Sequence, residues 1–149
     1  MAIDQSQHGT EPTIVHASCV AVAKRGCLII GASASGKSSL ALSLMGYGAS
    51  LIADDRVVLE RSATGIRASA PPAIRGLIEA RGVGILTCEP ANAVVIGVVV
   101  DMDTVETARL PQARTTELLG EPVTLLHRVC GPHFAPALMQ FLKSGRKSP

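Results

Sequence analysis

The sequence predicts an α/β protein with a mixed β-sheet flanked by helices, and three observations support this fold class. Residues 27–30 read as a short buried strand, a glycine-rich loop follows, and apolar residues then recur at helical spacing up to residue 45. Residues 93–100 are nearly all β-branched and apolar, which is typical of a central strand. Hydrophobic residues make up 47% of the chain and aromatic residues only 2%, so an aliphatic core is expected.

The expected elements are separated by recognisable turn signals. Gly46-Tyr47-Gly48 suits the end of the first helix, and Ala63-Thr64-Gly65 suits a hairpin turn. Pro132 suits the first position of a terminal helix with an apolar stripe. Residues 74–81 are predicted as a short helix or an irregular segment, and 101–106 as an acidic loop. In chain order, strands are expected at 14–22, 27–30, 50–53, 56–61, 66–69, 93–100 and 123–129.

Length, charge and composition limit the class of protein. The 149 residues are expected to form one domain at 13–142, between a flexible leader at 1–12 and a flexible tail at 143–149. A net charge of +2 gives no reason to expect nucleic-acid binding. The longest apolar run is far shorter than the ~20 residues of a membrane helix, so no membrane association is expected. The four cysteines form no Cys-x-x-Cys pair, and the polar start of the chain does not resemble a signal peptide, so a cytoplasmic location is expected.

The most informative motif is Gly31-Ala32-Ser33-Ala34-Ser35-Gly36-Lys37-Ser38, which matches the phosphate-loop pattern of Gly, four residues and Gly-Lys-Ser. Glycines let backbone N–H groups turn inward around phosphate oxygens, and the following helix N-terminus adds partial positive charge. Lys37 is expected to reach the β- and γ-phosphates, and the Ser38 hydroxyl to bind Mg²⁺. A chance Gly/Ser-rich turn is the alternative, but it does not account for the strand before the loop and the helix after it. The motif therefore predicts binding of a nucleoside triphosphate or another polyphosphate.

Two adjacent carboxylates, Asp54 and Asp55, follow the strand expected at 50–53. Because neighbouring residues on a strand point in opposite directions, the two are expected to do different jobs. One would ligate or orient Mg²⁺, and the other would accept a proton from the attacking hydroxyl. A polar turn between two strands is the alternative interpretation. With a phosphate loop in the same chain, we favour the functional one.

Four features in order along the chain resemble one family, the C-terminal catalytic domain of HPr kinase/phosphorylase. They are His16, the loop 31–38, the segment 53–57 and the segment 78–85, and the resemblance covers about residues 13–111. The last segment, Ile-Glu-Ala-Arg-Gly-Val-Gly-Ile, is similar to the family signature of Glu, an aliphatic residue, Arg-Gly, an aliphatic residue and Gly-Ile. The chain looks like the short form of the family without its N-terminal domain. The resemblance implies a phosphate-loop kinase core like that of phosphoenolpyruvate carboxykinase.

The resemblance also implies an activity and a set of roles. The chain would be a protein-serine kinase that uses ATP and Mg²⁺ to phosphorylate the phosphocarrier protein HPr, regulates the phosphotransferase system, and reverses the reaction by phosphorolysis. Family members assemble into rings, so a homo-oligomer is expected, as in the hexamers of related proteins. The implied site residues are Lys37 for the phosphates, Ser38 and Glu79 for Mg²⁺ with Asp55 as a further candidate, Asp54 as general base, His16 and Arg109 as phosphoryl contacts, and Arg81 with Gly82 from the signature.

Two other functions stay open at this point. A small-molecule or nucleotide kinase on a similar phosphate-loop scaffold usually has an Arg-rich lid, which this sequence lacks. The second is a non-catalytic nucleotide-binding regulator that keeps the loop. The substitution Asp54→Asn is expected to separate a catalyst from such a regulator, because a catalyst would lose phosphoryl transfer and still bind nucleotide. After Pro111 the resemblance fades, and residues 126–131 are only a rough counterpart of the loop associated with phosphorolysis.

Overall fold

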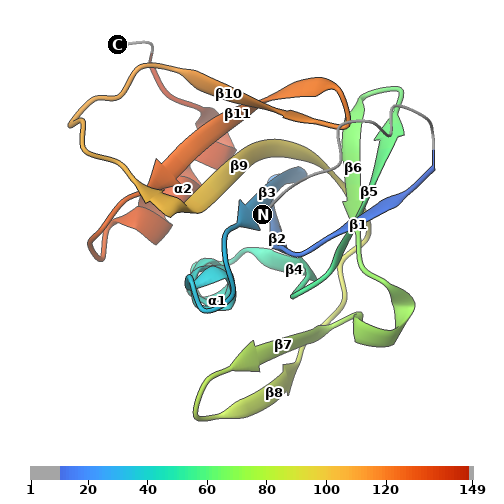
Figure 1. Ribbon diagram of the computed structural model, residues 1–149. Coiled ribbons are helices and arrows are strands. Elements are labelled where there is room, and N and C mark those ends of the chain that lie inside the picture. Colours follow the sequence, from blue (N-terminus) through green and yellow to red (C-terminus); the bar gives the residue numbers. More distant parts are fainter. Residues whose placement is uncertain (1–10, 148–149) are drawn as a thin grey trace.

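The fold is a curled mixed β-sheet with two helices packed on one of its faces (Figure 1). The computed structural model describes residues 11–147, so the leader predicted at 1–12 lies almost entirely outside the described residues. The helices are α1 (Lys37–Gly46) and α2 (Phe134–Ser144), and a single 3-10 turn, η1, spans Pro72–Ile74. The strands are β1 (Thr13–Val15), β2 (Ser18–Val22), β3 (Arg25–Ile30), β4 (Ser50–Ala53), β5 (Val57–Ser62), β6 (Gly65–Ser69), β7 (Leu77–Ala80), β8 (Gly84–Thr87), β9 (Val94–Val105), β10 (Arg114–Leu118) and β11 (Glu121–Arg128).

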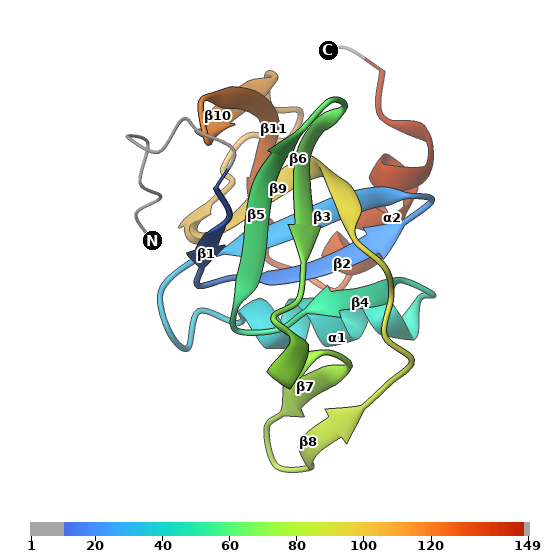
Figure 2. The same cartoon turned by 90° about the vertical axis from the view of Figure 1, so that its right-hand side faces the viewer.

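Strand β9 is the centre of the sheet because three other strands pair with it. The strand order is β1-β5-β6-β9-β3-β2-β4, and β11 also pairs with β9 and carries β10 at its far edge. β9 runs parallel to β3 and to β11 and antiparallel to β6. β6 pairs with the first residues of β9 and β11 with its second half, so a strand of 12 residues serves two neighbours on one edge. The sheet consequently curls, and Figure 2 shows β5 and β6 crossing in front of β2 and β3.

The alternation of side chains along the strands creates two hydrophobic cores, one on each face of the sheet. In β3, Cys27 and Ile29 point to the face that α1 and α2 cover, whereas Leu28 points to the opposite core. The same period of two divides β9, where Val98 and Val99 belong to different cores. The second core is closed by the curl of the sheet itself, from β1, β5 and β6. Both faces of β3 are therefore buried, which fixes the strand that leads into the phosphate loop.

Leu44 of α1 is expected to contribute strongly to stability, because its side chain is fully buried between the sheet and α2. Leu44→Ala should lower the free energy of unfolding by about 2–5 kcal/mol, since it removes buried methyl groups and leaves a cavity. Ser43→Ala is the matched control, because Ser43 is the exposed neighbour on the same helix. Denaturant unfolding of both variants measures the difference. Equal stability of the two variants would contradict the packing described here.

The structure corrects the sequence-based elements at several places. Residues 77–80 form strand β7, not a short helix or an irregular segment, and they pair with β8 in a separate hairpin. Most of 101–106 is not a loop, because β9 continues to Val105. The strand predicted at 14–22 is broken at His16, strand β10 was not predicted, and Pro132 lies just before α2 and not at its first position.

The hairpin at 63–65 and the end of the first helix are confirmed. Val58 pairs with Ser69 and Ser62 with Gly65, as the hairpin turn predicts. Burial raises the pKa of the Cys27 thiol to about 12 and raises that of Cys19 well above its usual range, so both behave as small core hydrophobes. None of the helices in residues 11–147 is long and apolar enough to span a membrane.

Candidate active site

The phosphate loop joins the end of β3 to the start of α1 and is held open by two glycines with positive φ. Gly36, at φ 98, lies directly before the first residue of α1. Gly31 has φ 153, and a Cβ there would come within 2.6 Å of Ser35 Oγ and 3.1 Å of Met102 Cβ. A side chain at Gly31 would therefore both strain the backbone and collide with the loop. The first turn of α1 carries no acidic side chain, so the partial positive charge of the helix N-terminus is not offset there.

The Lys37 side chain folds back onto the phosphate loop. Its Nζ donates hydrogen bonds to the carbonyl oxygens of Gly31 at 2.7 Å and Ala32 at 2.9 Å. An ammonium group has three N–H donors, so within residues 11–147 these two bonds leave one donor for an acceptor in the pocket. Lys37 also lines the pocket, and the ammonium is thus held at the place where the loop would receive a phosphate.

Asp54 lies behind the loop, at the end of β4, and is only 6% exposed. Its Oδ1 accepts hydrogen bonds from the Ser38 and Ser18 hydroxyls, both at 2.7 Å. Its Oδ2 accepts one from the backbone N–H of Glu79 at 3.2 Å. These three bonds compensate for the burial of a charged group and tie β2, α1 and β7 to the end of β4. Because the Ser38 hydroxyl donates its hydrogen bond to Asp54, the lone pairs of the Ser38 oxygen remain available to a cation.

Asp55 faces the opposite way, into solvent, beside His16. Its carboxylate lies 3.5 Å from His16 Nδ1 and 3.8 Å from Arg56 Nε, and its side chain is 63% exposed. The backbone explains the reversal: Asp55 has φ 70, and the Arg56 N–H donates to the Asp54 carbonyl at 2.8 Å. This is a tight, strained turn around a single residue, of a kind that clusters at functional sites. The adjacent carboxylates consequently have different partners and different burial.

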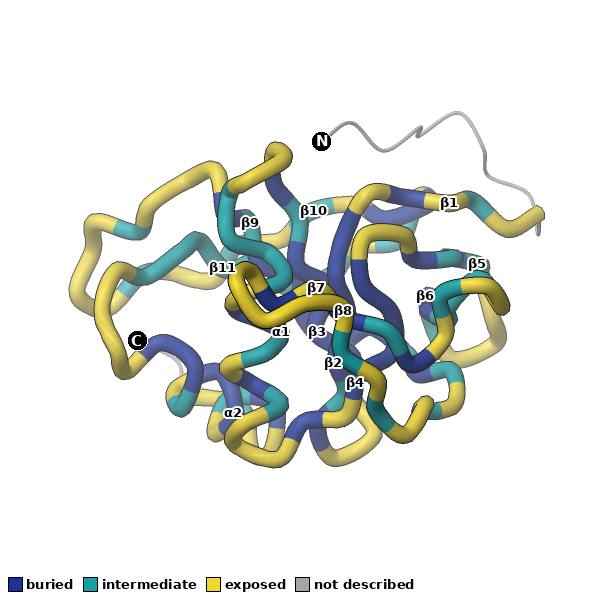
Figure 3. Tube along the Cα trace, turned by 90° about the horizontal axis from the view of Figure 1, so that it is seen from below, coloured by how far each residue is buried: buried dark blue, intermediate teal, exposed yellow. Residues whose placement is uncertain are grey.

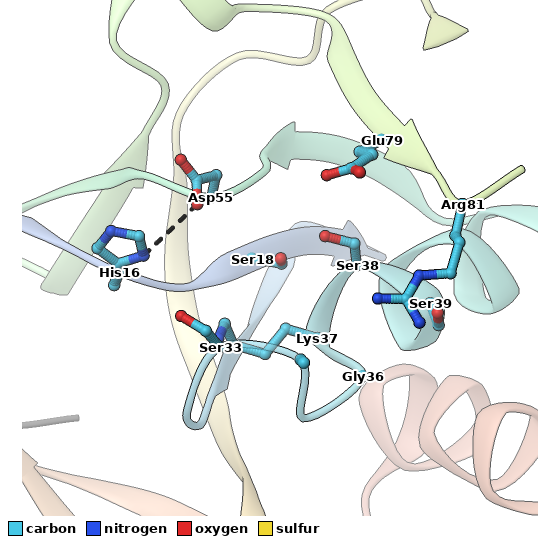
Figure 4. Close-up of a pocket in the computed structure, with 11 residues that line it drawn as sticks. His16, Ser18, Ser33, Gly36, Lys37, Ser38, Ser39, Asp55, Glu79 and Arg81 are labelled. Atoms are coloured by element: carbon cyan, nitrogen blue, oxygen red, sulfur yellow. Dashed lines mark ion pairs between the residues drawn. The ribbon is translucent and has the colours of Figure 1, made fainter. Parts of the chain in front are cut away.

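The hairpin of β7 and β8 forms the opposite wall of the pocket. Figure 4 shows Glu79 and Arg81 approaching from this hairpin, while Lys37 and Ser38 approach from the phosphate loop and His16 from the segment after β1. The pocket is open to solvent on one side and has a volume of about 340 Å³. Ile78 is buried against α1, which anchors the hairpin, whereas most of the outer strand β8 is exposed (Figure 3). The lining residues are His16, Ser18, Ser33, Ala34, Gly36, Lys37, Ser38, Ser39, Asp55, Glu79 and Arg81.

The donor set of the pocket suits Mg²⁺ better than a transition metal. Ser38 offers a hydroxyl oxygen, and Glu79 and Asp55 offer carboxylates. The described residues contain no group of three or more His, Cys, Asp or Glu side chains that could cage a metal by themselves. Mg²⁺ typically takes one or two protein oxygens and completes its shell with phosphates and water. The pocket therefore fits a metal that arrives with a phosphate ligand.

Comparison with known proteins assigns the chain to a family. The family model of the HPr Serine kinase C-terminal domain matches residues 7–106, which include the phosphate loop, both aspartates and the hairpin. The chain belongs to this family. The match ends near the end of β9, so the HPr kinase C-terminal domain pattern covers the pocket but not β10, β11 or α2.

Individual relatives agree with the family assignment. A protein of Bordetella pertussis called HPr kinase/phosphorylase is 45% identical over 75 residues, and a protein of the same name from Polaromonas naphthalenivorans is 38% identical over 82 residues. These stretches cover 50% and 54% of this chain but only 24% and 26% of the relatives, so the chain matches about a quarter of their length. The solved structure of the Hpr(Ser) kinase/phosphatase from Coxiella burnetii aligns with a TM-score of 0.71 over 88% of each chain at 24% identity. That likeness confirms the predicted mixed α/β fold, whereas the resemblance to phosphoenolpyruvate carboxykinase stays a prediction.

Most residues that the sequence singled out in this HPr kinase domain lie at the pocket. Arg109 does not, since it is exposed in the segment between β9 and β10 and does not line the pocket within the described residues. Glu106 anchors the start of that segment by accepting from the Arg114 guanidinium and from the Ala108 N–H. The hydrogen bond from Arg114, aided by the Ala108 N–H, lowers the pKa of Glu106, so this carboxylate stays ionised to a lower pH than an ordinary glutamate. Gly82 shapes the hairpin turn at φ 85.

Sequence reasoning missed two residues of this site. Ser18 is fully buried and donates to Asp54, but a serine within an apolar strand gives no signal of its own. Asp103 accepts from the Ala32 N–H of the phosphate loop at 3.0 Å. The position of Asp103 near the carboxyl end of the predicted central strand could have indicated it. β3 and β9 are parallel neighbours, and ligand-binding loops gather at the carboxyl ends of such strands.

Proposed function

We propose that this chain is an ATP- and Mg²⁺-dependent kinase that phosphorylates a serine of the phosphocarrier protein HPr. One observation carries the proposal: the phosphate loop and the Asp55–His16 pair line the same pocket. Phosphoryl transfer needs little beyond positioning, charge neutralisation and one carboxylate that faces the attacking hydroxyl. The family membership and the name of the relatives support HPr as the acceptor. A cytoplasmic location is part of the same proposal.

We propose roles for the two aspartates that reverse those implied by the resemblance, in which Asp54 is the base and Asp55 a candidate metal residue. Asp54 is buried and accepts three hydrogen bonds, one of them from Ser38, so its negative charge orients the Ser38 oxygen toward a metal. Asp55 is exposed and paired with His16, where an incoming serine hydroxyl has access to it. We therefore assign proton acceptance to Asp55 and metal positioning to Asp54. Ser38 and Glu79 would hold Mg²⁺, and the bound metal would neutralise negative charge on the phosphates.

The wall opposite the phosphate loop suits a protein acceptor. Val83 and Ile85, at the tip of the hairpin, are 76% and 63% exposed, and Arg81 on the same hairpin lines the pocket. Exposed apolar side chains beside a catalytic pocket are typical of a surface that contacts another protein. This observation favours a protein substrate over the small-molecule alternative.

The direct test is incubation of the purified chain with labelled ATP, Mg²⁺ and HPr. Label is expected on an HPr serine, and EDTA should abolish the transfer. HPr with that serine replaced by alanine is the control. Unlabelled HPr in the presence of intact, ATP-binding chain would reject the proposed function and favour a non-catalytic regulator.

Phosphorolysis and homo-oligomer formation are proposed on the family membership alone. If the reverse reaction operates, the chain incubated with phosphorylated HPr and inorganic phosphate should release pyrophosphate and unphosphorylated HPr. Light scattering tests the oligomer, and a single species of monomer mass would reject it.

A further inference from the structure

The end of β9 contains an irregularity that points a carboxylate at the back of the phosphate loop. Asp101 pairs with His127 of β11, but the next pairing joins Arg128 to Val105, so residues 102–104 have no partner on β11. Such bulges bend a strand, re-aim its side chains and recur beside active sites. The bulge is itself fixed, because Asp101 accepts from the Asp103 N–H at 2.9 Å and from the Thr104 hydroxyl at 3.1 Å.

The bulge brings two side chains to the loop. Met102 packs beneath it, since its Cβ would lie 3.1 Å from a Cβ built on Gly31 and its methyl group 3.6 Å from one built on Gly36. Asp103 accepts the Ala32 N–H with both carboxylate oxygens, each at 3.0 Å. Neither Ala32 nor Asp103 is among the described residues that line the pocket. Asp103 therefore acts on the loop and does not touch what the loop binds.

The contact reaches Lys37 through a single peptide group. The N–H of Ala32 and the C=O of Gly31 belong to the same planar peptide unit and point in opposite directions. Asp103 holds the N–H end at 3.0 Å, and Lys37 Nζ donates to the carbonyl end at 2.7 Å. A carboxylate on the N–H end polarises the unit and makes its carbonyl a stronger acceptor for the ammonium. The peptide is thus clamped between a negative and a positive side chain.

We propose that Asp103 is a positioning residue for nucleotide binding, which orients the Gly31–Ala32 peptide and through it places the Lys37 ammonium over the phosphate loop. The inference rests on the proposed function for its ligand, a nucleoside triphosphate. It explains why β9 leaves its pairing with β11 at this point. It also gives a role to an aspartate that lies outside the phosphate-loop motif.

The test compares Asp103→Ala, Asp103→Asn and the control Glu60→Gln in the 149-residue chain. Glu60 is a carboxylate on β5 that pairs with Arg67, so its substitution removes the same charge away from the loop. With a fluorescent ATP analogue, Asp103→Ala should raise the dissociation constant about fivefold, the effect of losing one net hydrogen bond. Asp103→Asn keeps an acceptor oxygen for the Ala32 N–H but loses the negative charge, so its dissociation constant should lie between those of the wild type and Asp103→Ala. Glu60→Gln should bind as the wild type does.

Amide hydrogen exchange reports directly whether Asp103 holds the Ala32 N–H, and rescue by Asp103→Asn separates this positioning role from a general loss of structure. The Ala32 amide should exchange about tenfold faster in Asp103→Ala than in Asp103→Asn, while the amides of β5 should not change. An Asp103→Ala variant that matches Glu60→Gln in affinity and in Ala32 exchange overturns the inference. Neither measurement needs HPr. If binding of the analogue depends on Asp103 but the chain leaves HPr unphosphorylated, the proposed function is rejected and the inference about Asp103 stands. A wild-type chain without affinity for the analogue would overturn both.

Discussion

Lys37→Ala is expected to lower the rate of phosphoryl transfer to HPr by about 10²–10³-fold, the typical cost of removing one preorganised donor from a developing charge. Lys37 Nζ is held across the loop by the Gly31 and Ala32 carbonyls, so its position is fixed before a phosphate arrives. Without the ammonium the pocket would lose the positive charge that neutralises the phosphates. Both the rate and the affinity for ATP should therefore fall, and steady-state kinetics at varied ATP measures the two effects separately.

Lys143→Met is the matched control, because Lys143 is an exposed cation in the last turn of α2 and does not line the pocket. Lys37→Arg gives a sharper comparison. Arginine keeps the charge but replaces a compact ammonium by a planar fork, so it should restore affinity for ATP more than it restores the rate. Full transfer activity in Lys37→Ala would show that the loop is not the phosphate site.

The parts of the fold that the sequence predicts correctly are those determined by local chemistry. The glycine loop, the helix ending near Gly46 and the hairpin at 63–65 follow from residues close to each other in the chain. The missed parts depend on distant partners. Strand β7 exists because it pairs with β8 and buries Ile78 against α1, although its own residues carry no clear period. Past residue 100, β9 is paired with β11, which comes later in the chain, only at Asp101 and Val105.

The candidate site shows the same division between local and distant determinants. The sequence located both aspartates and the family resemblance implied Asp54 as the base, but the adjacent pair itself does not distinguish the two roles. The assignment proposed above depends on Ser18 and Ser38, which contact Asp54, and on His16, which contacts Asp55. Which carboxylate is buried follows from the strained turn at φ 70, and a pair of adjacent aspartates does not reveal such a turn.

Asp55→Asn is expected to slow phosphoryl transfer by about 10²–10⁴-fold, the contribution of a positioned general base, while affinity for ATP stays within about twofold. The carboxylate is exposed, and its ion-pair partners within residues 11–147 are His16 and Arg56, so the substitution should leave folding stability almost unchanged. Single-turnover transfer to HPr and equilibrium binding of an ATP analogue measure the two quantities independently. Loss of binding together with transfer would contradict the assignment.

Asp54→Asn is the informative counterpart, because it changes the neighbouring carboxylate in a different environment. An asparagine would present an NH₂ group to one side of the site, where the Ser38 and Ser18 hydroxyls or the Glu79 N–H now donate, and at least one donor would lose its acceptor. The variant should be less stable by about 1–3 kcal/mol and should bind ATP with a weaker dependence on Mg²⁺. Thermal unfolding and Mg²⁺ titrations of binding test both expectations. If Asp54→Asn instead keeps its stability and Mg²⁺ response and loses only transfer, while Asp55→Asn remains active, then Asp54 is the base and the exposed pair of Asp55 and His16 serves substrate contact alone.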